Sequence, residues 1–359
     1  MKGKWLTAVV CLLLLIFGIA VAALMQKRAK IPELVMQLGA ADYGDAQDAM
    51  RELTTMRALV IEDVCDVLAN PTSAGYTDPQ RWRAALVLGD IGGERAVEVL
   101  LRALKESESK DVQWNCIVAL GKLGATEAAE ELIRILQDDD MAEVVRLTAI
   151  RTLGLLDAQD AVGPLIGQLE KRPDAQQVIA ERRAEEREAK EAQERADERK
   201  KYEDADLPVP AHLLEQEVAE EEEEAAEITD ADRPQLRIAS CEALAMLGDK
   251  EAVPPLCEAA DSSYEPEYSV RIAAIVALGD LADASDEQVI DVLVRNLKDV
   301  TWDMNADGED DDPDGDVRVA AAHVLRRLGG KNDTAVAALQ RAADDKHYWV
   351  RFAATESIE

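Results

Sequence analysis

The chain is poor in the side chains on which most enzymes and nucleic-acid-binding proteins depend. It has only three histidines and two phenylalanines in 359 residues, and its 40 Lys and Arg are outnumbered by 73 Asp and Glu, for a net charge of −33. Because nucleic-acid affinity rests on neutralising phosphates with Lys and Arg, this balance argues against nucleic acid as a partner. No histidine has a Cys, Ser or Glu partner at motif spacing, and there is no glycine-rich phosphate loop. We therefore expect no catalysis.

Cysteine is scarce too, and its arrangement excludes common cysteine sites. The five cysteines include no C-x-x-C pair and no metal-ligand spacing with histidine. Cys65, Cys116, Cys241 and Cys257 lie in apolar helical stretches. We predict that they are buried as small hydrophobic residues rather than used in redox chemistry.

What the chain has in abundance is one repeated helix. The stretch Tyr268–Leu281 carries apolar residues on nearly every side, so we expect both of its faces to be packed. In it, Arg271 lies seven residues before Leu278, and Gly279 follows. We call the position of Arg271 the slot. The slot recurs, mostly 32–35 residues apart, with two longer intervals of 91 and 47 residues, at Arg81, Gln113, Arg146, Arg237, Arg271, Arg318 and Arg351, after a degenerate copy at Ala46.

This spacing predicts the fold class. A period near 33 is typical of helix pairs stacked into a solenoid, and the two longer intervals are insertions. A second amphipathic helix follows each first one, as in Ala96–Leu104 and Ala161–Leu169. We predict an all-α, right-handed α-solenoid in which slot residues bridge to acidic groups or carbonyls of the adjoining unit. The glycine that follows the leucine in four of the copies should allow close helix approach.

The segment from Asp111 to Leu136 resembles a known family. Its pattern, D-V-x-x-x-x-I-x-A-L-G-K-L-G-A-T-E-A-A-E-E-L-I-R-I-L, is similar to the bacterial HEAT-like repeats of the phycobilin-lyase type. The resemblance covers residues 33–170 and 234–359. It implies a scaffold whose second helices line a concave surface for protein partners. As a remote alternative, it implies a bilin lyase-like or chaperone-like protein, although no lyase-specific residue is recognised here.

The amino-terminal segment 1–30 reads as a membrane anchor. Trp5–Met25 contains no charged residue and is long enough to cross a bilayer, with lysines on both sides. The alternative is a signal peptide cleaved at Ala20-Val21-Ala22, which would give a secreted or periplasmic protein. We expect a single-pass protein of the bacterial cytoplasmic membrane, preceded by one transmembrane helix and with the array on the extracytoplasmic side.

Beyond the anchor, the chain divides into repeats of residues 31–172, an insertion of residues 173–233 and repeats of residues 234–359. In the insertion, Glu181–Lys201 has opposite charges four residues apart, which favours a solvated helix. The region between Glu203 and Asp232 has no Lys or Arg, which indicates a partly disordered acidic arm. Alternatively, this arm docks a basic partner.

An acidic loop, residues 301–316, interrupts the second set of repeats. Its D-x-[DN]-x-[DN]-G spacing around Gly308 resembles an EF-hand calcium loop, but Asp replaces the usual Glu at the last position and Pro313 is unusual there. Two hypotheses remain open: a plain acidic insertion, or a calcium site that makes the chain a calcium-responsive binding module. The candidate ligands are Asp303, Asn305, Asp307, Glu309, Asp311 and Asp314.

Overall fold

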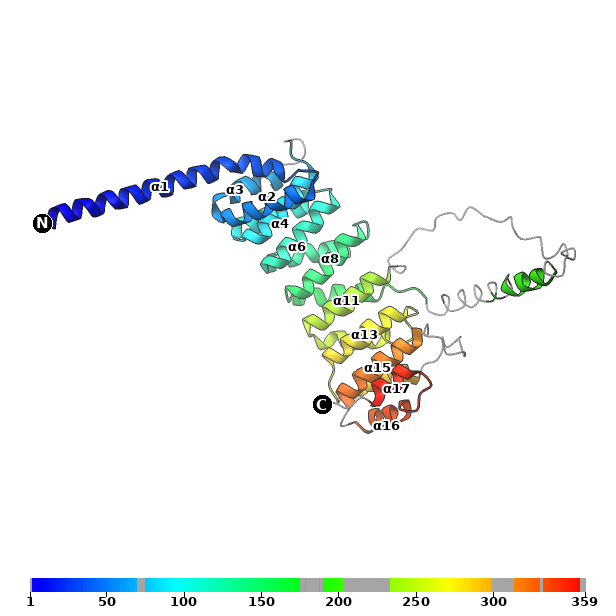
Figure 1. Ribbon diagram of the computed structural model, residues 1–359. Coiled ribbons are helices and arrows are strands. Elements are labelled where there is room, and N and C mark those ends of the chain that lie inside the picture. The colour runs from blue at the N-terminus through cyan, green and yellow to red at the C-terminus, as the bar shows by residue number, and fades with distance from the viewer. Residues whose placement is uncertain are drawn as a thin grey trace. The chain divides into compact units, whose positions relative to one another are not determined.

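The computed structural model describes residues 2–69, 75–174, 178, 187, 190, 192–202, 233–298, 313–329 and 332–355. Side chains are described from residue 13 onward, except those of residues 313, 314 and 329. Every regular element in these ranges is a helix (Figure 1), which confirms the predicted all-α class. The chain forms two compact units, unit 1 at Met1–Ala161 and unit 2 at Val162–Glu359, and each is described by itself.

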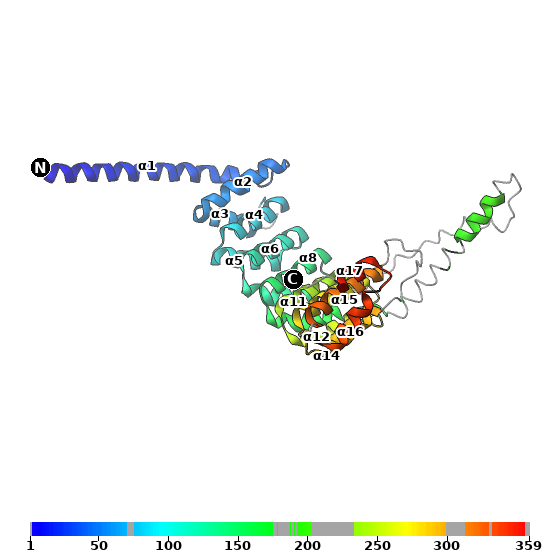
Figure 2. The same cartoon turned by 60° about the horizontal axis from the view of Figure 1, so that its bottom comes forward.

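Unit 1 begins with one long helix, α1, and continues as a stack of helix pairs. The first helices α4, α6 and α8 pack on one another in order, while the second helices α3 and α5 form the other layer (Figure 2). The elements of unit 1 are α1 (Lys2–Gln37), α2 (Tyr43–Met56), α3 (Ile61–Ala69), α4 (Asp78–Ile91), α5 (Glu94–Glu106), α6 (Lys110–Leu123), α7 (Ala129–Gln137) and α8 (Glu143–Leu155), with the 3-10 turns Arg57–Leu59, Thr126–Ala128 and Gln159–Ala161.

Unit 2 repeats this arrangement. Its helix α9 packs directly on α11, although residues 170–233 separate them in the chain, so the array resumes in place after the insertion. First helices α11, α13, α15 and α17 pack in order. The elements are α9 (Val162–Leu169), α11 (Pro234–Leu247), α12 (Val253–Ala259), α13 (Tyr268–Leu281), α14 (Glu287–Lys298), α15 (Pro313–Gly329), α16 (Asp333–Ala342) and α17 (Tyr348–Thr355), with the 3-10 turn Lys250–Ala252 before α12.

Local sequence explains the helix ends. At the start of α4, the Thr77 amide donates to Gln80 Oε1 at 2.9 Å, which satisfies a backbone group that the helix cannot. At the other end of such helices, Gly124 and Gly248 take left-handed backbone angles with φ of 63° and 71°. That conformation strains residues with a Cβ, which is why glycine ends α6 and α11.

In copies where glycine follows the repeat leucine, it lets neighbouring first helices approach closely, as predicted. A Cβ built on Gly89 would lie 2.9 Å from Ala119 Cβ of the next first helix, and one on Gly121 would lie 3.0 Å from Thr152 Cγ2. In unit 2, a Cβ on Gly279 would meet Val324 Cγ2 at 3.0 Å. The same contact therefore recurs from pair to pair and fixes the register of the first helices.

One packing prediction was wrong. The helix α13 is not covered on both faces, since Val276 is 48% exposed and Tyr268 is also exposed. In α17, likewise, Val350 and Ala353 are buried, whereas Trp349 is exposed. A first helix is covered by its own second helix and by neighbouring first helices. One side therefore stays open.

The predicted membrane segment Trp5–Met25 lies within α1. In the described part of the chain, no helix has the length and apolar composition of a membrane span. Side chains of residues 2–12, which include the first part of the predicted segment, lie outside that description. From residue 13 to Met25 the α1 side chains are largely exposed, while burial begins at Ile31 and continues at Leu34 and Leu38.

Candidate protein-binding surface

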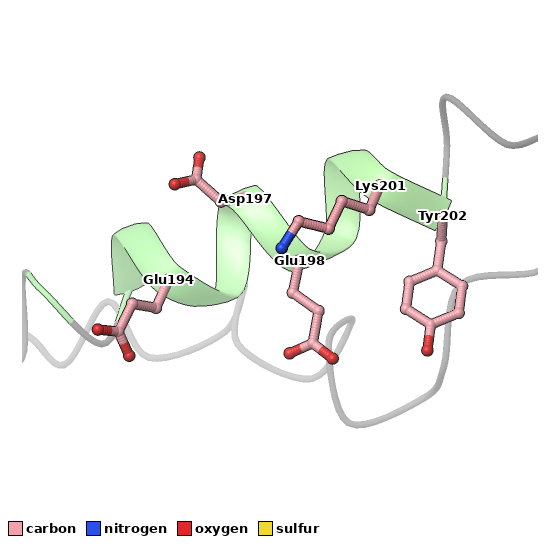
Figure 3. Close-up of a pocket in the computed structure, with 5 residues that line it drawn as sticks. All are labelled: Glu194, Asp197, Glu198, Lys201 and Tyr202. Atoms are coloured by element: carbon pink, nitrogen blue, oxygen red, sulfur yellow. The ribbon is translucent and has the colours of Figure 1, made fainter.

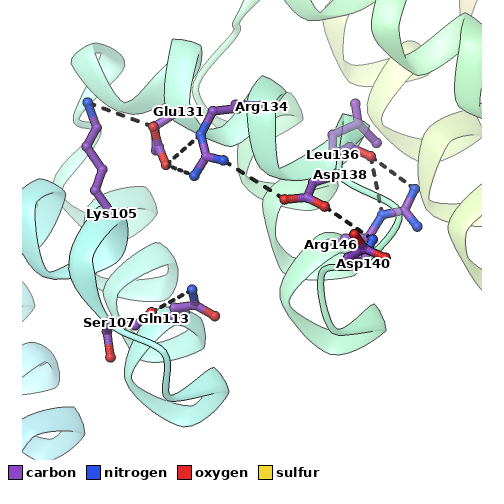
Figure 4. Close-up of polar contacts among 9 residues, drawn as sticks. All are labelled: Lys105, Ser107, Gln113, Glu131, Arg134, Leu136, Asp138, Asp140 and Arg146. Atoms are coloured by element: carbon purple, nitrogen blue, oxygen red, sulfur yellow. Dashed lines mark hydrogen bonds and ion pairs between the residues drawn. The ribbon is translucent and has the colours of Figure 1, made fainter.

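The slot side chains tie successive helix pairs of unit 1 together. Arg81 Nε donates to the Leu68 carbonyl at 3.3 Å, and Arg146 Nη2 donates to the Leu136 carbonyl at 3.0 Å. In the copy where glutamine replaces arginine, Gln113 Nε2 donates to the Ser107 carbonyl at 2.9 Å (Figure 4). Each carbonyl belongs to the end of the preceding second helix, where helix carbonyls lack a partner in their own helix. The slot is therefore a structural device in unit 1.

Unit 2 uses the slot in the same way and adds buried ion pairs. Arg237 Nη1 donates to the Lys171 carbonyl at 3.3 Å, and its Nε lies 3.0 Å from Glu265 Oε2, with both side chains fully buried. Burial raises the pKa of the Glu265 carboxyl, and the charge of Arg237 opposes that rise. Arg318 Nη1 lies 2.8 Å from Asp345 Oδ2. The predicted bridges to carbonyls and acidic groups are thus confirmed.

The cysteines are placed as expected for core residues. Cys65, Cys116, Cys241 and Cys257 are all buried and free of disulfides. Burial raises the pKa of the Cys65 and Cys257 thiols to about 11 and that of Cys116 to about 12. A thiol with such a pKa is almost wholly protonated near neutral pH and is a poor nucleophile.

The described residues offer no metal cluster of three or more His, Cys, Asp or Glu side chains. The candidate calcium ligands from Asp303 to Asp311 lie outside the described residues, and Asp314 is described only as backbone of α15. The calcium site therefore stays a sequence-based prediction.

A shallow pocket lies on the charged helical segment 192–202 (Figure 3). Among the described residues, its lining side chains all come from this one segment. Three are carboxylates on a solvated helix, and the pocket does not have the enclosed apolar lining of a small-molecule site. The lining residues are Glu194, Asp197, Glu198, Lys201 and Tyr202.

The distinctive surface of unit 1 is an apolar patch on the open side of its first helices. The residue directly after the slot is Trp82 in α4, Trp114 in α6 and Leu147 in α8, and none of the three is buried. Trp114 is 41% exposed, and Val118, one turn later, is 38% exposed. Because the first helices share one register, equivalent residues line up across them. We define the unit 1 patch as Trp82, Leu86, Trp114, Val118, Val144 and Leu147.

Contacts at its borders hold the unit 1 patch in place. The Arg83 guanidinium lies 4.7 Å from the centre of the Trp82 ring, and it donates to the carbonyl of Leu38. At the far ends of the helices, Lys122 pairs with Asp90 of the preceding first helix. The patch is thus built on rigid helices rather than on loops, which suits a preformed binding surface.

Unit 2 carries a comparable apolar surface. The position after the slot is again apolar and only partly covered, and in α13 it is flanked one turn on either side by exposed Tyr268 and Val276. At the last first helix, the Phe352 ring stacks on Tyr348 with centroids 6.3 Å apart. We define the unit 2 patch as Ile238, Tyr268, Ile272, Val276, Val319 and Phe352.

Sequence reasoning missed both patches, although a signal was available. When the repeats are aligned on the slot, the next residue is large and apolar in all seven copies: Trp82, Trp114, Leu147, Ile238, Ile272, Val319 and Phe352. A helix position that packs loosely yet never becomes polar indicates a surface kept apolar for contact. This position was instead interpreted as core.

Comparison with protein families identifies the repeats. Residues 77–144 and 223–307 match the family model described as HEAT repeats, which agrees with the resemblance seen in the sequence. The sequence matches no curated protein.

Several solved structures are similar to this chain at low identity. Human deoxyhypusine hydroxylase, in complex with glycerol, is 20% identical over 84% of this chain and 95% of its own, with a TM-score of 0.29. The CpcE–CpcF complex of phycocyanin lyase from Nostoc sp. PCC7120 is 15% identical over 86% of this chain and 91% of its own, with a TM-score of 0.35. YibA of E. coli is 13% identical over 93% of this chain and 94% of its own, with a TM-score of 0.48.

Proposed function

We propose that this HEAT-repeat chain is a scaffold that holds a protein partner on the unit 1 and unit 2 patches and acts by binding rather than by catalysis. The supporting observation is the row of partly exposed apolar residues after the slot in each unit, and two of the three members in unit 1 are tryptophans. Tryptophan is enriched among the residues that dominate binding energy at protein interfaces. Repeat arrays present such rows as extended surfaces. The first helices, rather than the expected second helices, therefore provide the contact.

The same proposal includes a tether at the membrane. Leu14, Phe17 and Met25 are among the apolar α1 side chains that lie exposed at the end of unit 1. A contiguous exposed apolar helix of this kind is stable when lipid covers it. We place the chain in the cytoplasmic membrane with the array on the extracytoplasmic side. Protease added to intact spheroplasts should then digest the array, and protection until lysis would contradict this orientation.

Position-specific photocrosslinking tests the partner surface. A photoreactive phenylalanine analogue is placed at Trp114 or Val276 on the patches, and at Arg102 or Glu130 on the exposed sides of second helices α5 and α7. In cells that produce the full chain, we expect one distinct adduct from the patch positions and none from the second helices. Adducts from Arg102 or Glu130 alone would show that the second helices provide the binding surface. Absence of adducts from all four positions would contradict the scaffold function.

A further inference from the structure

One edge of the unit 1 patch carries a row of carboxylates. Each of its three first helices has an acidic residue in its first turn: Asp78 in α4, Asp111 in α6 and Glu143 in α8. Acidic side chains suit this position because they face the positive end of the helix dipole. Each lies three or four residues before the patch residue of its own helix, Trp82, Trp114 or Leu147. The cation Lys110 directly precedes Asp111, and Asp78 lies 3.6 Å from Arg81 of the same helix.

The spacing of the patch matches an α-helix laid across it. Neighbouring packed helices lie about 8–10 Å apart. A helix rises about 1.5 Å per residue, so residues seven apart are separated by about 10.5 Å on nearly the same face. A crossing helix with apolar residues at this heptad spacing would place one on Trp82, the next on Trp114 and the next on Leu147. About fifteen residues would reach across all three first helices.

We infer that the unit 1 patch binds a basic amphipathic helix that crosses α4, α6 and α8. The inference rests on the proposed scaffold function and adds the class of partner. The apolar side of the partner covers the tryptophans, and Lys or Arg residues along one of its flanks face Asp78, Asp111 and Glu143. The chain's net charge of −33 favours the approach of a cationic partner and disfavours an acidic one.

The binding test uses the full chain in nanodiscs of zwitterionic lipid, with the signal from empty nanodiscs subtracted. The probe is a fluorescein-labelled, 18-residue amphipathic peptide of leucine and lysine, and its binding is measured by anisotropy. A peptide with the same leucine positions but glutamate in place of lysine is the charge control. We expect the lysine peptide to bind and the glutamate peptide to bind at least about tenfold more weakly.

Two matched pairs of variants locate the binding site. Val118→Ser changes the patch, while Val336→Ser changes a residue of α16 with nearly the same exposure, 37% against 38%. We expect Trp114→Ser and Val118→Ser together to weaken peptide binding by about tenfold or more, and Val336→Ser to leave it unchanged. Asp111→Asn should weaken peptide binding and reduce its dependence on salt. Glu98→Gln, on the exposed side of α5, should change neither. All five positions are exposed, so circular dichroism should show unchanged folding.

Equal binding by the Val118→Ser and Val336→Ser variants would mean that net charge alone holds the peptide, and it would overturn the inference. Equal affinity for the lysine and glutamate peptides would also overturn it. These failures differ from a failure of the scaffold function. If Trp114 forms its adduct in cells while the lysine peptide does not bind, the scaffold stands and the partner class is wrong.

Discussion

At the residue scale, the slot is the position on which the repeats depend most. Its side chain donates to carbonyls at or just after the end of the preceding second helix and so joins one helix pair to the next. Arg146 donates to Leu136 at the end of α7, and Arg351 donates to Asp345 in the turn after α16. A glutamine serves in one copy because a single donor to Ser107 is enough there. The requirement is a donor of the right length rather than a charge.

The buried pair Arg237–Glu265 predicts a large effect from a single truncation. Glu265→Ala leaves a charged guanidinium without its carboxylate in a fully buried site. We expect the free energy of unfolding to fall by about 3–5 kcal/mol in urea denaturation. The exposed pair Lys250–Asp283 is the control, and Asp283→Ala should cost far less, because solvent screens this pair. Similar losses from both variants would show that burial of the pair is not what stabilises unit 2.

The close helix contacts give a second prediction. In Gly89→Ala, the new methyl would lie 2.9 Å from Ala119 Cβ and 3.0 Å from its Cα, so α4 and α6 must move apart. We expect a loss of about 1–3 kcal/mol of stability. Gly167→Ala in α9 is the matched control, because a Cβ there meets nothing within 4 Å and alanine favours the helix. A stabilised Gly89→Ala protein would contradict the argument.

At the scale of elements, α9 and α11 form a helix contact that does not need the chain between them. Besides the Arg237 hydrogen bond to Lys171, Arg172 Nη2 lies 2.6 Å from Glu258 Oε2 of α12. The array therefore continues from α9 to α11 with the same helix packing that it uses elsewhere, although residues 170–233 lie between the two helices in the chain.

Replacing residues 175–232 with a short flexible linker should accordingly leave the melting temperature nearly unchanged. The loop-closure entropy of a flexible segment changes slowly with its length, by about 0.6 kcal/mol for each doubling. Calorimetry measures the transition. Loss of cooperative unfolding in the shortened chain would show that the insertion contributes to the core.

We predict calcium binding in the acidic loop, residues 301–316. Bound calcium would relieve repulsion among its carboxylates in the folded state, and binding stabilises by mass action, about 2.7 kcal/mol at a hundredfold excess over the dissociation constant. We expect millimolar calcium to raise the melting temperature, and Asp303→Asn with Asp307→Asn to abolish that rise. A wild-type melting temperature that does not respond would leave the loop as an acidic spacer.

At the scale of the whole molecule, α1 divides near residue 26 into a part that we propose as the membrane tether and a part that belongs to unit 1. Its apolar first part is exposed where described. Its second part is bound to unit 1 through buried Ile31, Leu34, Val35 and Leu38. Arg28 Nη1 donates to the Leu59 carbonyl at 3.0 Å, and Lys30 Nζ lies 3.1 Å from Glu52 Oε1. The helix is thus part of the array and not a flexible linker.

Truncation separates the two purposes. A chain that begins at Lys27 should keep its unfolding midpoint and leave the membrane fraction. A chain that begins at Gly39 loses four buried apolar side chains, each worth roughly 1.5–3 kcal/mol, and its unfolding midpoint should fall sharply. Fractionation and urea denaturation measure the two effects. Membrane binding by the chain that begins at Lys27 would show that the part of α1 before Lys27 is not the tether.

The sequence by itself determined the all-helical repeat, its register and the use of the slot and glycine positions, because periodicity in a repeat reports directly on the stacking of like units. It also placed the four core cysteines correctly. Only the tertiary structure decided which apolar residues stay uncovered: Val112 and Val118 lie on the same helix α6, yet the first is fully buried and the second is not. The difference depends on which neighbours cover each side of a first helix. Hydrophobicity along one helix does not contain that information. Aligning the repeats shows that the position after the slot stays apolar, but only the packed helices show that it is left uncovered.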